Sequence, residues 1–183
     1  GSTCLVSGVT STVPAGMQAF RNFTWNCPSQ SAVISLGAGL TTINENFTVQ
    51  NTGAQSLSLG TTGFTLTLGG DLILNGGTLN LNSGAAVSTI LNISGNYNQT
   101  AGALTCTATS ASTINFLGTG KTYTQSGGTI TNTMLNYAVN AAAASLTLND
   151  NISIATGRTF TVTTGTLNTS DKVISGAGTF TLT

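Results

Sequence analysis

Few side chains in this sequence could carry out acid–base chemistry. The 183 residues include four acidic residues, four basic residues and no histidine. Without histidine the usual general base and the Ser-His pair are both missing. Glycoside hydrolysis needs two carboxyl groups at a defined separation, and only Glu45 and Asp71 are spaced to meet on neighbouring coils of the repeat described below. We therefore expect no catalytic residue, and a degenerate polysaccharide-acting β-helix enzyme that uses Asp71 is the enzymatic alternative.

Residues that could bind a metal or a cofactor are equally scarce. Calcium would require several carboxylates, and the nonapeptide repeat of calcium β-rolls is absent. The stretch Gly118–Thr122 ends like a phosphate-binding loop but lacks the earlier glycine of that motif. The sequence predicts no metal site and no cofactor.

Three cysteines could form a disulfide or remain free. Cys4 and Cys27 are separated by close to one repeat, so we expect a disulfide between adjacent coils. A pair of free buried thiols is the alternative. Cys106 occupies the position of Leu81 one repeat later and is predicted to be a small buried side chain, not a reactive thiol.

Two features could form a binding surface. The four large aromatic residues that could contact a sugar are Trp25, Tyr97, Tyr123 and Tyr137. An outward polar ladder is predicted on successive coils and consists of Asn80, Asn82, Thr105, Thr107, Thr131 and Thr133. Regular threonine ladders on β-solenoids bind ice, but Thr65 and Thr67 correspond to Ile90 and Asn92 one repeat later, so that pattern breaks after one coil. An ordinary solvated face is the alternative.

These candidates depend on a repeat of about 25 residues. In the stretch 62–81, alternating apolar residues form three short strand patterns separated by glycine, asparagine and aspartate. The spacing predicts three inward columns, which are Leu66 with Leu91 and Phe116, Leu72 with Tyr97, and Leu79 with Leu104.

A three-strand unit that repeats at a constant interval predicts an all-β, three-sided parallel β-solenoid. An antiparallel sandwich is the alternative, but hairpins do not return the same side chain at a fixed interval. Residues 1–40 follow the repeat poorly and are expected to form an N-terminal cap or an irregular first coil. Residues 41–183 are expected to form one continuous solenoid domain.

Corner residues also recur with the repeat. Asn46, Asp71, Asn96 and Lys121 are expected at one corner, and Gly77, Gly102 and Gly127 at another. The phase is disturbed after Thr131, because the interval from Tyr123 to the similarly placed Ile152 is longer than one repeat. We expect a looped-out or bulged corner at residues 140–144, with a short helical turn as the alternative.

Composition limits the possible partners. Only 4% of the residues are charged and the net charge is zero, so the chain has no electrostatic footprint for nucleic acid or an anionic membrane. No apolar run reaches about 18 residues, the length that would cross a bilayer. Low charge with abundant threonine and asparagine suits a secreted or cell-surface protein.

The stretches GGDLILNGGTLNLNSG, STINFLGTGKTYTQSGGTI and VISGAGTFTLT resemble the strand-repeat regions of large exported bacterial surface proteins and adhesins, and more distantly filamentous-haemagglutinin-type solenoids. The resemblance covers residues 40–183 and implies a stalk, fibre or adhesive surface outside the cell. A carbohydrate- or ice-binding face is the alternative function.

The final strand pattern, Thr179–Thr183, has no charge, proline or capping helix after Lys172. An open strand of this kind exposes unpaired backbone groups. We therefore expect this end to be a junction, either with adjoining coils of a longer chain or with another copy of the protein.

Overall fold

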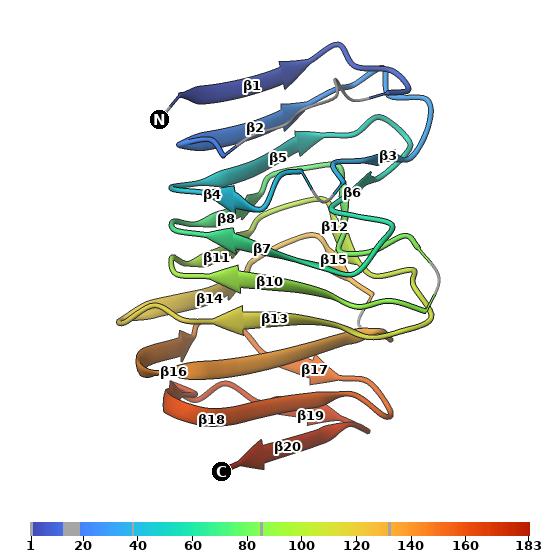
Figure 1. The fold of residues 1–183 in the computed structure, drawn as a ribbon. Helices are drawn as coiled ribbons and strands as arrows, with labels where there is room; N and C mark the ends of the chain where they lie inside the picture. The colour runs from blue at the N-terminus through green and yellow to red at the C-terminus, as the bar shows by residue number, and fades with distance from the viewer. Residues whose placement is uncertain (1, 13–18, 38, 85, 132) are drawn as a thin grey trace.

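The computed structural model describes residues 2–12, 19–37, 39–84, 86–131 and 133–183, and over these ranges it contains strands and no helix (Figure 1). All strand pairings are parallel, and the chain winds through about seven stacked turns. The structure is a three-sided β-solenoid, as the sequence predicted, and the sandwich alternative is wrong.

Each turn passes through three sides in the order one, two, three. Side one consists of β4 (Thr42–Ile43), β7 (Phe64–Leu68), β10 (Thr89–Ile93), β13 (Ser112–Phe116), the first half of β16 (Leu135–Leu148), the first half of β18 (Thr159–Asn168) and β20 (Thr179–Leu182). Side two consists of β1 (Thr3–Ser7), β2 (Asn22–Asn26), β5 (Phe47–Asn51), β8 (Leu72–Leu74), β11 (Tyr97–Gln99), β14 (Lys121–Gln125) and the second halves of β16 and β18.

Side three is built from shorter strands, β3 (Ile34–Ser35), β6 (Leu57–Ser58), β9 (Thr78–Asn80), β12 (Ala103–Thr105) and β15 (Thr129–Ile130). The last two turns contribute β17 (Ile152–Ile154) and β19 (Ile174–Gly176), which pair with each other in a separate two-stranded sheet. Figure 1 places this pair below β15 in the stack. The parallel ladder of side three is therefore interrupted between β15 and β17.

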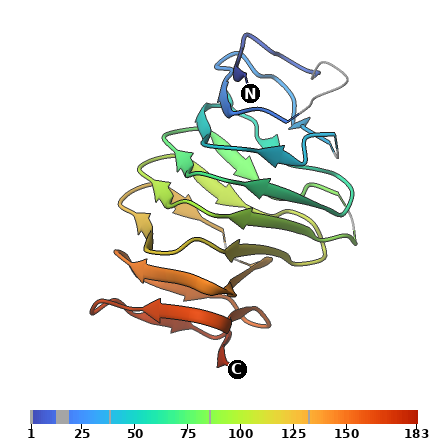
Figure 2. The same cartoon turned by 60° about the vertical axis from the view of Figure 1, so that its left-hand side comes forward.

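Strand register shows that the coils differ in length. In the middle of the stack Leu72 pairs with Phe47 on one side and with Tyr97 on the other, which is the interval that the repeat predicted. The interval is shorter at both ends, where Cys4 pairs with Phe23 and Phe160 pairs with Phe180. The stack narrows toward its C-terminal end in the rotated view (Figure 2).

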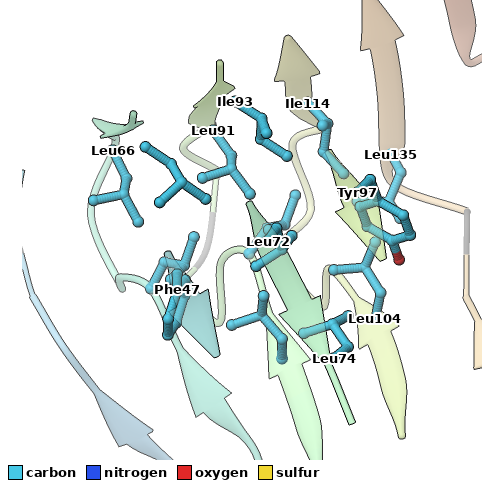
Figure 3. Close-up of a cluster of buried hydrophobic side chains, with 14 of the residues drawn as sticks. Phe47, Leu66, Leu72, Leu74, Leu91, Ile93, Tyr97, Leu104, Ile114 and Leu135 are labelled. Carbon is cyan, nitrogen blue, oxygen red and sulfur yellow. The ribbon is translucent and has the colours of Figure 1, made fainter. Parts of the chain in front are cut away.

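Inward side chains form apolar columns that run through the stack (Figure 3). Leu66 with Leu91, Leu72 with Tyr97, and Leu79 with Leu104 pair as predicted. Phe116 is the exception, because it pairs with Ile93 while Leu91 pairs with Ile114. The coil there is two residues shorter than predicted, and a two-residue shift keeps Phe116 inward because strand side chains alternate with period two.

One corner is closed by side chains that accept hydrogen bonds from the next coil. Asn46 Oδ1 accepts from the Asp71 N–H at 2.9 Å, Asp71 Oδ1 from the Asn96 N–H at 2.7 Å, and Asn96 Oδ1 from the Thr122 N–H at 3.0 Å. Asn22 begins this row by accepting from the Asn46 N–H. The prediction of Lys121 for this corner was wrong by one position, because the coil from Asn96 to Thr122 is one residue longer than the two coils between Asn46 and Asn96.

The glycine corner also follows the coil length. Gly77 and Gly102 have φ of +65° and +72°, and the third member is Gly128 at +74°, one residue after the predicted Gly127. A Cβ on Gly102 would clash with the Gly77 carbonyl oxygen of the coil before it. Positive φ and close backbone stacking together require glycine at this corner.

The corner at residues 140–144 joins sides one and two within β16. The pairing of β16 with β18 shifts register on either side of Asn140, consistent with the predicted bulge. The backbone remains extended, so the helical-turn alternative is wrong. The prediction that Tyr123 and Ile152 occupy equivalent positions of the repeat was also wrong. Tyr123 pairs with Leu148 on side two, whereas Ile152 lies on β17.

The segment 1–40 also contributes strands to the stack. β1 pairs with β2, β2 pairs with β5, and β3 pairs with β6. At the other end, Phe180 and Leu182 of β20 continue the inward columns of Phe160 and Val162. They are 42% and 69% exposed, because no described strand pairs with the outer edge of β20.

Candidate functional site

The carboxyl groups considered for catalysis take part in contacts between coils. Glu45 forms an ion pair with Arg21, with a distance of 2.6 Å between Oε1 and Nε, and accepts a hydrogen bond from Asn22. The Arg21 hydrogen bond is the main cause that lowers the pKa of Glu45 below its ordinary value. Asp71 Oδ1 accepts from both the backbone and the side-chain amide of Asn96. Neither set of contacts places a carboxylate next to a nucleophilic side chain, as a general base would require.

No group of three or more Cys, Asp or Glu side chains suited to a metal ion occurs in the described part of the chain. Within the same residues, no helix is long and apolar enough to cross a membrane.

The predicted Cys4–Cys27 disulfide is wrong. Cys4 pairs with Phe23, so the register places it four residues, or about 13 Å along the strand, from the level of Cys27. A disulfide requires Cα atoms within about 7 Å. Both thiols are free: Cys4 is half-buried, and Cys27 is buried with its Sγ 3.6 Å from the Val6 carbonyl oxygen. Cys106 is buried as predicted.

The predicted outward ladder does not form one surface. Asn80 and Asn82 are buried, because connections between strands fold over them: those that precede β7 and β10 contact Asn82, and the one that follows β12 contacts Asn80. Asn82 Nδ2 donates to the Val87 carbonyl and to Thr89 Oγ1, and Asn80 Nδ2 donates to Thr107 Oγ1 at 2.8 Å. The two asparagine side chains therefore form hydrogen bonds with the connections and do not face solvent.

The threonines of the ladder remain at the surface. Thr105 is half-buried on β12, and Thr107, Thr131 and Thr133 are exposed outside the strands. On side one the register confirms that Thr65 and Thr67 lie opposite Ile90 and Asn92. No regular array of threonines arises on either side in the described residues.

Most of the large aromatic residues belong to the core. Trp25 is fully buried and its Nε1 donates to Gln30 Oε1 at 2.9 Å. Tyr97 is also fully buried and stacks on Tyr123, with ring centroids 4.9 Å apart and planes inclined by 12°. Trp25 and Tyr97 therefore offer no surface to a sugar.

Tyr123 and Tyr137 instead line a cavity at the interruption of side three. The cavity has a volume of about 240 Å³. Its walls come from Tyr123, Gln125, Ile130, Tyr137, Asn151, Ile152, Ser153 and Ser175. Sides one and two continue past this level through β16 and β18, so the opening in the wall lies on side three.

Two equivalent tyrosine–glutamine pairs lie next to each other in the stack. Tyr97 donates its hydroxyl hydrogen to Gln99 Oε1 at 2.7 Å, and Gln99 Nε2 donates to the carbonyl oxygens of Gly102 and Thr129 at 3.3 and 3.0 Å. One coil later, Tyr123 donates to Gln125 Oε1 at 3.1 Å. Among the described residues, Gln125 Nε2 has no hydrogen-bond partner.

The difference between the two glutamines follows from the interrupted ladder. Gln99 reaches Thr129 because β15 lies directly against β12. The strand that would serve Gln125 in the same way is β17, which does not pair with β15. The Tyr137 hydroxyl likewise has no hydrogen-bond partner in the described part of the chain, and Tyr137 lines the same cavity.

Searches against protein-family models, curated proteins and solved structures found no match to this chain.

Sequence reasoning named Tyr123 and Tyr137 but did not identify Gln125, Asn151 or the serines of the cavity. The detectable signal was the Tyr-x-Gln pattern at 97–99 and 123–125, which places a glutamine where earlier coils have Val49 and Leu74. A polar residue repeated on an inward position indicates a polar partner inside the stack. The interruption of side three, which leaves Gln125 without its partner, has no comparable signature.

Proposed function

We propose that this chain is a non-catalytic structural and adhesive module of an extracellular bacterial surface protein, and that its copies associate end to end. The observation that carries the proposal is the open end of the core at β20. Phe180 and Leu182 point along the inward columns and are exposed, and the outer edge of β20 is unpaired in the described residues.

An edge of this kind is a template for another strand. Proteins usually protect such edges with charge, proline or a covering element, and β20 has none of these within its four residues. The opposite end has a matching feature, because among the described strands β1 pairs only with β2, and its other edge is also unpaired.

The order of the sides supports head-to-tail contact. Each turn runs from side one to side two, β20 lies on side one, and β1 lies on side two. A second copy placed below the first would therefore set its β1 against the second half of β18 on side two, in the same parallel sense. On side one its Phe20, which bridges Ile43 of β4, would face the open edge of β20. Contacts of this type are heterologous and propagate into fibres.

Light scattering of the purified chain over a range of concentrations tests the proposal. We expect the mean mass to rise with concentration, and to stay at the monomer value in Phe180→Lys and Thr181→Pro. Ile90→Lys is the matched control, because Ile90 is 38% exposed on the outer face of side one in the middle of the stack. A wild-type chain that remains monomeric, with variants that behave identically, would exclude self-association through this edge.

A further inference from the structure

We propose that the cavity between β15 and β17 is a binding site for one neutral sugar residue. The Tyr123–Gln125 pair, Tyr137 and the serines of β17 and β19 form its walls. This inference is independent of end-to-end association, because the cavity lies in the side of the stack and not at its ends.

The polar atoms of the wall point to a ligand with hydroxyl groups. Gln125 Nε2 offers two N–H donors, and its equivalent in the previous coil donates to two carbonyl oxygens. The Tyr137 hydroxyl can donate and accept, as can the hydroxyl of Ser175. A sugar hydroxyl does both as well, so this set of amide and hydroxyl groups suits it.

The absence of charge in the cavity excludes ionic ligands. None of the eight described residues that line it is charged. The carboxylate next to the Gln125 backbone, Asp150, is already engaged, since its Oδ2 accepts from the Gln125 N–H at 2.7 Å. A carboxylate or phosphate ligand would lose its hydration without gaining a cation, which is unfavourable.

The apolar part of the wall and the volume define the size of the ligand. Tyr123, Ile130 and Ile152 supply hydrocarbon surface next to the polar groups, the mixture that small-molecule sites use. A cavity of about 240 Å³ lies below the usual range for drug-sized ligands, about 300–1,000 Å³. It suits one ring and not an oligosaccharide. The exposed position of Ser175 on β19 places one wall at the surface, so the terminal residue of a surface glycan could enter.

Nuclear magnetic resonance titration tests this proposal. The probes are the methyl glycosides of glucose, galactose, mannose and N-acetylglucosamine, added separately to isotope-labelled protein. We expect at least one to cause saturable shifts in the Gln125 side-chain amide and the backbone amides of residues 151–153, with no comparable shifts in the Gln99 side chain.

Two variants separate binding from folding. Gln125→Met keeps the side-chain volume but removes the amide donors, and we expect the Kd to rise about tenfold, as for the loss of one or two hydrogen bonds. Ser175→Trp places a large side chain at the wall from an exposed position, and we expect it to abolish binding while the protein stays folded. Thr109→Trp is the matched control, because Thr109 is exposed in the connection after β12.

No saturable shift with any of the four glycosides would overturn the proposal and leave a water-filled cavity. Binding that survives Ser175→Trp, or that Thr109→Trp weakens equally, would overturn the assigned position. Self-association is measured separately by light scattering, so failure of the sugar site and failure of the structural role give different results.

Discussion

Asn46, Asp71 and Asn96 perform the same task on three successive coils. Each accepts a hydrogen bond from the backbone N–H at the corner of the next coil. Asp71 and Asn96 lie between strands, and leaving their N–H groups unpaired in a partly buried position would cost free energy. The row therefore fixes the vertical alignment of the coils as well as closing the corner.

Replacing Asn96 tests this role. Asn96→Ala removes the acceptor of the Thr122 N–H and the donor to Asp71, so we expect the free energy of unfolding to fall by about 1–3 kcal/mol. Asn98→Ala is the control, since Asn98 is half-buried two residues away and forms no side-chain hydrogen bond in the described residues. Chemical denaturation of both variants measures the difference, and equal losses would contradict the role of the row.

A second substitution tests the apolar columns. Leu91 is fully buried between Leu66 and Ile114, so Leu91→Ala should lower the free energy of unfolding by about 2–5 kcal/mol. Ile90→Ala is the control, because Ile90 points outward on the same strand. We expect it to cost under about 1 kcal/mol. A larger effect at Ile90 than at Leu91 would reverse the assignment of inward and outward positions.

Thiol labelling distinguishes free cysteines from the disulfide that the sequence predicted. Cys27 and Cys106 are buried, and burial raises the pKa of the half-buried Cys4 thiol, which disfavours the reactive thiolate. We expect slow labelling of Cys4 alone in the folded, unreduced protein. Three labels should be incorporated after unfolding without reductant, counted by mass spectrometry. A single label in the unfolded protein would show a disulfide.

At the scale of strands, each of the three tyrosines stacks on or contacts another aromatic ring of the core. Tyr97 stacks on Tyr123, and Tyr137 contacts Phe160 with ring centroids 5.9 Å apart. Burial raises the pKa of each tyrosine hydroxyl above its ordinary value of 10.0, and the neighbouring tyrosine adds to the effect at Tyr97 and Tyr123. The folded state therefore holds all three in the neutral form.

This arrangement predicts how stability depends on alkaline pH. A raised pKa in the folded state means that the stabilisation is complete below the unfolded-state value of about 10 and is lost as pH rises above it. We expect tyrosinate absorbance to appear only together with loss of the β-sheet circular dichroism signal. Ionisation near pH 10 in a protein that remains folded would contradict the burial of the three hydroxyls.

The parts that sequence predicted were those that depend on side-chain alternation and a constant repeat. Leu72 and Tyr97 could be paired because their coil has the length of the repeat, whereas Phe116, Lys121 and Gly127 were misplaced by one or two residues where the coil length changes. Within a strand, a shift of two residues leaves a side chain on the same face, because side chains alternate with period two. At a corner each position has its own backbone conformation, so a shift of one residue already places the wrong residue there.

The site was less predictable because it depends on what covers a strand and on which strands fail to pair. Asn80 and Asn82 alternate with leucines as outward residues should, but neighbouring connections bury them. Gln125 lines a cavity because β17 does not continue the ladder of β15. Both effects involve segments distant in sequence that local patterns do not describe.

For the whole molecule, the low charge has a measurable consequence. Arg21 and Glu45 form the ion pair found in the described residues, and both side chains are exposed. Exposed pairs contribute little and are screened by salt. We expect the free energy of unfolding to change by less than about 0.5 kcal/mol between about 0.05 and 0.5 M sodium chloride. A change above about 1 kcal/mol in denaturation experiments would contradict a fold held by packing and hydrogen bonds.

Because the coils differ in length, the perimeter of the stack changes along its axis. The coils are longest in the middle of the stack, around Tyr97 and Tyr123, and shorten toward β1 at one end and β20 at the other. Copies joined end to end would therefore meet at faces of similar perimeter. Side two has eight strand levels in the part of the chain that the structure describes, so each copy would add about 38 Å at about 4.8 Å per level. The resulting filament would have a beaded outline, with one narrow waist at every junction.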